Sequence, residues 1–135
     1  MNFIIAGMLS LSVFSIIPSK TIEYIAEPQE QIEVELSIEG KIIKSATEYG
    51  LNVETMLRIA DAESDFKNVP NYKYTDEDGR YTAYGPFMIT RTTYKEYCSD
   101  NVLDRMDIDK NIDCAMKIAT KSGLHHWNES RTNWN

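Results

Sequence analysis

The chain has 135 residues, 42% of them hydrophobic, which suits one compact domain better than two. Its 21 acidic and 14 basic residues give a net charge of −7, which excludes the basic surface by which nucleic-acid-binding proteins hold phosphates. The same charge disfavours adhesion to an anionic membrane or polymer through bulk electrostatics, so we expect any such target to be recognised locally.

The chain starts with an uncharged apolar segment, FIIAGMLSLSVFSII, at residues 3–17. This segment has the length of the apolar region of a secretory signal and is shorter than the roughly 20 residues of a membrane-spanning helix. No Lys or Arg precedes it, and no clear cleavage site with small residues follows it. We interpret residues 1–19 as a signal peptide, with an uncleaved membrane anchor or a buried helix as the alternatives. The first two interpretations both predict an exported protein, periplasmic or extracellular.

A second segment, KTIEYIAEPQEQIEVEL at residues 20–36, is acidic and has no clear hydrophobic period. We interpret it as a spacer before a folded domain at residues 37–135. Apolar positions then recur at helical spacing from Ser37 to Tyr49, and Gly50 stands where a C-terminal cap belongs. Asn52 suits the N-cap of a second helix, which continues to Ser64.

The second helix carries Glu63 on its apolar side. Glu63 lies seven residues after Met56 and three after Ala60, so it continues their buried stripe. A carboxyl group in apolar surroundings should have a raised pKa, and it can then act as a general acid. The alternative is a glutamate at the edge of the stripe that reaches water or a partner such as Arg58 or Lys67.

Aromatic and polar residues alternate in the next segment, NYKYTDEDGRYTAY at residues 71–84. With Asp78-Gly79 at its centre, the segment predicts a short β-hairpin. The spacing around Gly79 does not fit a calcium-binding loop, because Tyr74 and Gly85 would fall on the first and twelfth ligand positions.

Two more helices are expected after the hairpin. A short one covers Thr90 to Cys98, and Asp107 suits the N-cap of a longer one that ends at Gly123. The tail from Leu124 is aromatic and polar without a period, and we expect its tryptophans to pack it onto the domain. Its two adjacent histidines lack acidic or cysteine residues spaced to complete a metal site, so no metal is expected. The predicted fold class is α+β, mostly helical with a small β-hairpin.

Two cysteines, Cys98 and Cys114, accompany the export segment. An even number in a small exported chain predicts one disulfide, whose loop would stabilise the fold by about 3 kcal/mol. Two buried free thiols are the alternative.

Three short motifs follow one another in the chain. Glu63-Ser64 ends a helix, GPFMI occupies residues 85–89, and Asn111-Ile112 opens a later helix. In this order they resemble the lytic transglycosylase (SLT) domain of the lysozyme-like superfamily, over residues 37–123. The resemblance implies a lysozyme-like domain that cleaves peptidoglycan glycan strands. It also implies an enzyme that needs no cofactor, and we expect a monomer. The net charge excludes nucleic acid as a partner, and an uncleaved N-terminal segment is the one expected contact with a membrane.

The resemblance also implies the role of each site residue. Glu63 is the catalytic acid/base, and the expected substrate contacts are Ser64, Tyr84, Gly85, Phe87, Met88, Ile89 and Asn111. Glu63 would protonate the oxygen between N-acetylmuramic acid and N-acetylglucosamine, while the substrate's own N-acetyl oxygen supports the positive charge. As a carboxylate it would then take a proton from the sugar's 6-hydroxyl, which closes a 1,6-anhydro ring.

The chain also departs from the family pattern. Met88 stands where the family commonly has Gln, and the Ala-Tyr-Asn-Ala-Gly segment, with its tyrosine near the acid, is absent. Structural roles remain open for Ser64 as a helix-end hydroxyl, Gly85 as a turn glycine and Asn111 as an early-helix polar group. The rival functions are a muramidase or chitinase-like hydrolase, a glycan-binding module without turnover, and a structural domain with a salt-bridged Glu63.

Overall fold

The computed structural model describes residues 35–135. The interpretations of residues 1–19 as an export segment and of residues 20–34 as a spacer lie outside these described residues. Within residues 35–135, no helix is long and apolar enough to cross a membrane.

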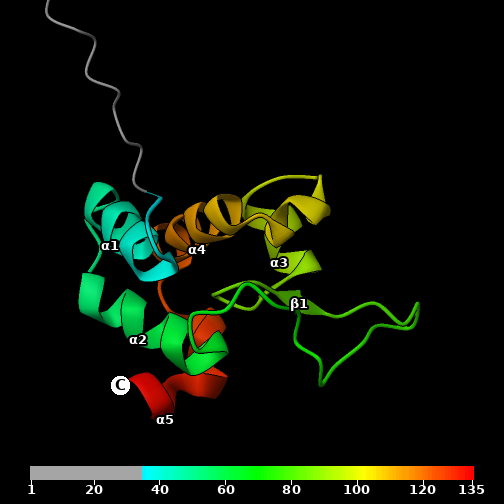
Figure 1. Cartoon of the computed structure of the whole chain (residues 1–135). Helices are drawn as coiled ribbons and strands as arrows, with labels where there is room; N and C mark the ends of the chain where they lie inside the picture. Colours follow the sequence, from blue (N-terminus) through cyan, green and yellow to red (C-terminus); the bar gives the residue numbers. More distant parts are fainter. Residues whose placement is uncertain (1–34) are drawn as a thin grey trace, which may run out of the picture. The chain divides into compact units, whose positions relative to one another are not determined.

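The described part of the chain is mostly helical, with one small antiparallel sheet (Figure 1). This confirms the predicted α+β class. The elements in chain order are α1 (Ile38–Glu48), α2 (Val53–Ser64), β1 (Ala83–Tyr84), β2 (Ile89–Thr90), α3 (Arg91–Tyr97), the 3-10 helix η1 (Val102–Met106), α4 (Ile108–Ser122), the 3-10 helix η2 (His125–Ser130) and α5 (Arg131–Trp134).

Side-chain caps fix where the longer helices begin. The side chains of Asn52 and Asp107 accept hydrogen bonds from the backbone N–H three residues further on, which confirms both predicted N-caps. Thr90 does the same at the start of α3. The predicted C-terminal signals also hold, because Gly50 and Gly123 follow α1 and α4 with φ angles of 67° and 72°.

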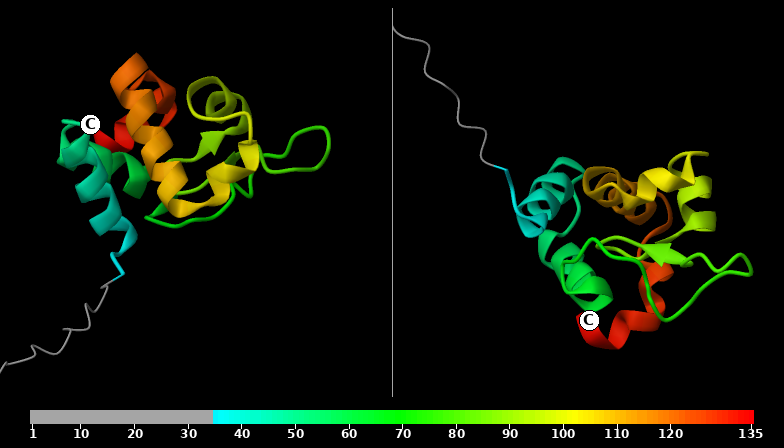
Figure 2. Two further views of the ribbon diagram at one scale, coloured as in Figure 1. Left: turned by 90° about the horizontal axis from the view of Figure 1, so that it is seen from above. Right: turned by 45° about the vertical axis from the view of Figure 1, so that its right-hand side comes forward.

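Helix α4 lies at the centre of the hydrophobic core. It contributes buried residues from Asn111 to Ala119 and packs against α1, α3 and η1. Helix α2 packs against α1 on one side and against η2 and α5 on another, so the last residues of the chain lie beside α2 (Figure 2). Trp127 and Trp134 are both buried, which confirms that tryptophans pack the tail onto the domain.

The segment at residues 71–84 forms the predicted hairpin. Thr75 and Tyr81 form an antiparallel bridge, and the N–H of Gly79 donates to the carbonyl of Asp76 at 2.9 Å in the turn. The hairpin projects from the helices in all the ribbon views (Figures 1 and 2). At its base β1 pairs with β2, and Pro70 adds a further bridge to Tyr84.

Cys98 and Cys114 form a disulfide, as predicted. Their Cα atoms lie 5.7 Å apart, and the bond joins the end of α3 to α4. Nothing in the sequence predicted the helices η1, η2 and α5, which are all shorter than two α-helical turns.

Candidate active site

Glu63 lies in the last turn of α2, and the C-cap residue Asp65 follows the helix in the left-handed conformation (φ 56°). Its side chain is partly buried, while the neighbouring Asp61 and Asp65 are exposed, as the helical spacing predicts. The hydroxyl of Ser130, at the end of η2, donates a hydrogen bond to Glu63 Oε1. The position of Glu63 on the apolar face of α2 therefore places its carboxyl in contact with the C-terminal segment.

Burial raises the pKa of Glu63 above the ordinary value of 4.5, and this is the largest influence on the group. The hydrogen bond from Ser130 lowers the pKa, because it stabilises the ionised carboxylate. The negative charge of Glu129 raises it again. The net effect is a raised pKa, so Glu63 keeps its proton to a higher pH than an exposed glutamate does, as a general acid requires.

The two basic side chains that could neutralise Glu63 are engaged elsewhere. Arg58 pairs with Glu54 at 2.6 Å, and Lys67 pairs with Asp65 at 2.6 Å. Within residues 35–135 Glu63 forms no ion pair, so neither Arg58 nor Lys67 is the partner that the structural alternative named.

Ser64 joins the first motif to the second. Its hydroxyl oxygen lies 3.0 Å from the carbonyl oxygen of Pro86 and 3.2 Å from that of Ala60, and it accepts a hydrogen bond from the N–H of Lys67 at 3.1 Å. These contacts fix the end of α2 against the turn between β1 and β2. Ser64 is therefore a structural link here, and its side chain stays partly accessible.

Asn111 joins the second motif to the third. Its amide nitrogen donates to the carbonyls of Tyr84 at 3.0 Å and Arg105 at 2.8 Å, and its oxygen accepts from the N–H of Phe87 at 3.4 Å. The side chain is 0% exposed, so it holds backbone inside the domain and does not reach a ligand at the surface. A Cβ on Gly85 would lie 2.3 Å from Asn111 Nδ2, which explains the glycine.

The other predicted contact residues divide by exposure. Phe87 and Ile89 are buried in the core, where the Phe87 ring meets Trp127 edge-on at 6.0 Å between ring centres. Tyr84 and Met88 are partly exposed, and Met88 has a left-handed φ of 46°. The structure thus brings all three motifs together, but it leaves only Ser64, Tyr84 and Met88 of the contact set, besides Glu63, with accessible side chains.

The C-terminal segment supplies a site residue that the sequence analysis missed. Ser130 contacts Glu63 between two buried tryptophans, and the Trp134 indole N–H donates to Ser130 Oγ at 3.0 Å. Trp127 and Trp134 are seven residues apart with Ser130 between them, a spacing that places all three on one helical face. This spacing could have indicated that Ser130 points inward with the two rings.

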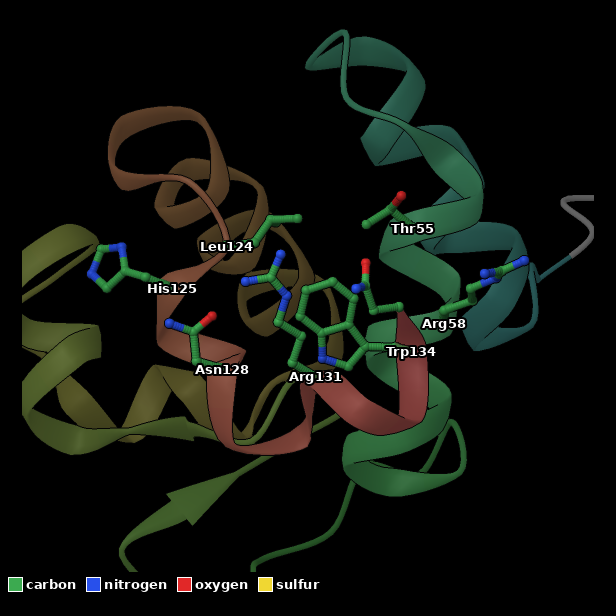
Figure 3. Close-up of a pocket in the computed structure, with 8 residues that line it drawn as sticks. Thr55, Arg58, Leu124, His125, Asn128, Arg131 and Trp134 are labelled. Carbon is green, nitrogen blue, oxygen red and sulfur yellow. The ribbon is translucent and has the colours of Figure 1, made fainter.

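A pocket of about 490 Å³, lined in part by Trp134, lies between α2 and the segment that follows α4 (Figure 3). Its lining includes Thr55, Arg58, Leu124, Asn128, Arg131 and Trp134. A second pocket of about 570 Å³ lies between the hairpin and α3, and a third of about 40 Å³ includes Met88 and Trp127. Glu63 lines none of these three.

No group of three or more His, Cys, Asp or Glu side chains suited to a metal ion occurs within residues 35–135. The site can transfer protons through one partly buried carboxyl group that lies beside a hydroxyl.

No family model, curated protein or solved structure matches this chain.

Proposed function

We propose that this protein is an exported lytic transglycosylase that cleaves the bond between N-acetylmuramic acid and N-acetylglucosamine in peptidoglycan, with Glu63 as its acid/base. The observation that carries the proposal is the partly buried Glu63 carboxyl, which has a raised pKa and no ion pair within residues 35–135. Raising the pKa of a buried carboxyl is how enzymes keep a glutamate available to donate a proton to a leaving oxygen. The Cys98–Cys114 disulfide supports export, because disulfides persist in oxidising compartments.

The proposed reaction uses the Glu63 carboxyl twice. Protonated Glu63 gives its proton to the glycosidic oxygen as the bond to the anomeric carbon breaks, and the N-acetyl oxygen of the substrate bonds to that carbon. The ionised Glu63 then takes the proton of the 6-hydroxyl, whose oxygen displaces the N-acetyl oxygen. Glu63 ends the cycle protonated, and the product carries a 1,6-anhydro ring.

A hydrolase is the second candidate, and Glu129 favours it. Glu129 is close enough to raise the pKa of Glu63 through its charge. A second carboxylate near the acid is what most glycoside hydrolases use to activate water or to form a covalent intermediate. In that case the products would carry ordinary reducing ends, and Glu129→Gln would reduce cleavage as Glu63→Gln does.

The test is release of soluble fragments from purified sacculi by wild type, Glu63→Gln and Glu54→Gln. Positioned proton transfer contributes about 10²- to 10⁴-fold to rate, so we expect Glu63→Gln to lose at least a factor of about 10². Glu54→Gln makes the same chemical change at an exposed position of α2 and should keep full activity.

Mass spectrometry of the products separates the remaining possibilities. Anhydro ends are one water lighter than reducing ends, so anhydro products from wild type support the transglycosylase. Reducing ends alone reject it in favour of the hydrolase. A wild-type protein that retains glycan strands but releases nothing is a binding module.

A further inference from the structure

Ser130 has more hydrogen-bond partners than its single proton can serve at once. Its oxygen lies within hydrogen-bond distance of Glu63 Oε1 and 3.0 Å from the Trp127 carbonyl oxygen, and both of these are acceptors when Glu63 is ionised. A hydroxyl has one proton to donate and two lone pairs to accept with. The proton of Ser130 therefore points either at Glu63 or at Trp127.

Trp134 supplies the other donor of this cluster. Its indole N–H lies 3.0 Å from Ser130 Oγ and 3.2 Å from the Trp127 carbonyl oxygen. An indole nitrogen can only donate, so Trp134 always leaves the Ser130 proton free to be donated elsewhere. Trp127 and Trp134 are 4% and 6% exposed, so their rings shield one side of the half-buried Ser130 and Glu63 from water.

The cluster gives Glu63 Oε1 a hydrogen-bond partner in both protonation states of the carboxyl. When Glu63 is ionised, Ser130 donates to the carboxylate, and Trp134 donates to Ser130. When Glu63 is protonated, its O–H donates to Ser130 Oγ, and the Ser130 proton turns to the Trp127 carbonyl. Rotation of one hydroxyl changes one state into the other, and no heavy atom has to move.

We propose that Ser130 is a positioning residue for Glu63, whose hydroxyl turns between Glu63 and the Trp127 carbonyl as the carboxyl gains and loses its proton. The catalytic part of this inference rests on the proposed function, in which Glu63 acts first as an acid and then as a base. A single hydroxyl that serves both states keeps the carboxyl in one place through both steps.

The pKa of Glu63 also depends on the charged groups around it. Glu129 on η2 is the charged group whose field acts on Glu63. The remaining charged side chains of α2 and of the elements packed against it are Glu54, Arg58 and Asp61 on α2, Glu39, Lys41, Lys44 and Glu48 on α1, and Arg131 on α5. Helix η2 also carries the titratable side chains of His125 and His126. Asp65 and Lys67, which follow α2, pair with each other. Removal of the Ser130 hydroxyl therefore leaves burial and Glu129, and both raise the pKa of Glu63.

The direct test is a titration of the Glu63 carboxyl in the full chain by carbon NMR of glutamate-labelled protein, with the signal assigned from Glu63→Gln. A hydrogen bond to a charged group is lost in Ser130→Ala, so we expect the pKa of Glu63 to rise by about one unit. Ser130→Thr keeps a hydroxyl and should restore the wild-type titration. Ser122→Ala removes a hydroxyl that donates only to a backbone carbonyl in α4 and should change nothing.

An unchanged Glu63 titration in folded Ser130→Ala overturns the proposal, as does a shift that Ser130→Thr fails to reverse. This readout does not depend on turnover, so it remains decisive if wild type proves inactive and the proposed function fails. In an active enzyme, the basic limb of the profile of kcat/KM against pH reports loss of the proton from Glu63. That limb should move up in Ser130→Ala by the same amount as the NMR titration.

Discussion

Glu63 combines a position that the sequence predicts with a contact that it does not. Helical periodicity is a local property, so residues 56, 60 and 63 suffice to place the carboxyl on the buried stripe of α2. The hydrogen bond from Ser130 joins residues 67 positions apart, and no local pattern encodes such a distance. The same holds for Asn111, whose amide reaches backbone 24 and 27 residues away.

The raised pKa of Glu63 predicts how stability depends on pH. Between the ordinary carboxyl pKa of 4.5 and the raised folded value, the folded protein holds a proton that the unfolded chain has released. The free energy of unfolding contributed by Glu63 is therefore fully present below the ordinary pKa and is lost as pH rises through the folded pKa. The glutamine side chain in Glu63→Gln does not titrate, so this variant does not lose that free energy of unfolding as pH rises.

We therefore expect Glu63→Gln to gain thermal stability relative to wild type as the pH rises from about 4 to about 7. Thermal unfolding followed by circular dichroism at a series of pH values measures the difference in Tm. The Tm of Glu54→Gln should follow that of wild type across these pH values more closely than the Tm of Glu63→Gln does. Parallel Tm curves for Glu63→Gln and wild type would show that burial does not perturb this carboxyl.

Gly85 carries a second prediction at the scale of single residues. In Gly85→Ala the new Cβ would lie 2.3 to 2.7 Å from three side-chain atoms of Asn111, in a residue with φ 84°. Because Asn111 holds three backbone groups, its displacement leaves buried polar groups unpaired, and we expect a loss of more than about 2 kcal/mol. Chemical denaturation measures the loss.

Gly79→Ala is the matched control. Gly79 has a similar φ of 75°, but a Cβ there meets nothing within 4 Å. Only the backbone strain of about 1–2 kcal/mol is then expected. Equal losses in the two variants would mean that the contact with Asn111 has no role in stability.

At the scale of elements, the sequence predicted the helices that have local signals at both ends. The side chain of Asn52 caps the start of α2, and Gly123 follows the end of α4 with a backbone conformation that favours glycine. Both helices occur where these residues predict them. Helices η1, η2 and α5 have no capping hydrogen bond from their N-cap side chains. They form because tertiary packing of residues such as Trp127 and Trp134 holds them, and a short sequence window does not contain that packing.

The disulfide between α3 and α4 leads to a prediction about how strongly these helices are held together. It closes a loop with a sequence separation of 16, which includes η1. Loop closure of this length stabilises the fold by about 3 kcal/mol, so Cys98→Ala/Cys114→Ala should lower the free energy of unfolding by about that amount. Denaturant unfolding of the variant and wild type, with and without reductant, measures it.

Reductant should destabilise wild type and leave the double variant unchanged. Titration of the unfolded, unreduced wild type should find no free sulfhydryl. Two reactive thiols there would contradict the disulfide and remove the support that it gives to export.

For the whole molecule, the net charge of −7 works against the proposed substrate. Peptidoglycan carries carboxylates on its peptide stems, so an acidic enzyme and its polymeric substrate repel each other over distances set by the salt concentration. The screening length falls from about 30 Å at about 10 mM salt to about 8 Å at about 150 mM. Screening therefore removes most of the long-range repulsion without reaching the buried groups around Glu63.

We expect initial rates of sacculus cleavage to rise between about 10 mM and about 150 mM salt, through faster association rather than faster chemistry. Uncharged chitooligosaccharide is the control, and its binding should not change with salt over this range. Release of soluble fragments and calorimetric binding measure the two effects. If sacculus cleavage instead falls with salt, then local attraction outweighs the net charge, and the exposed Arg131 in the pocket beside Trp134 is the first side chain to replace.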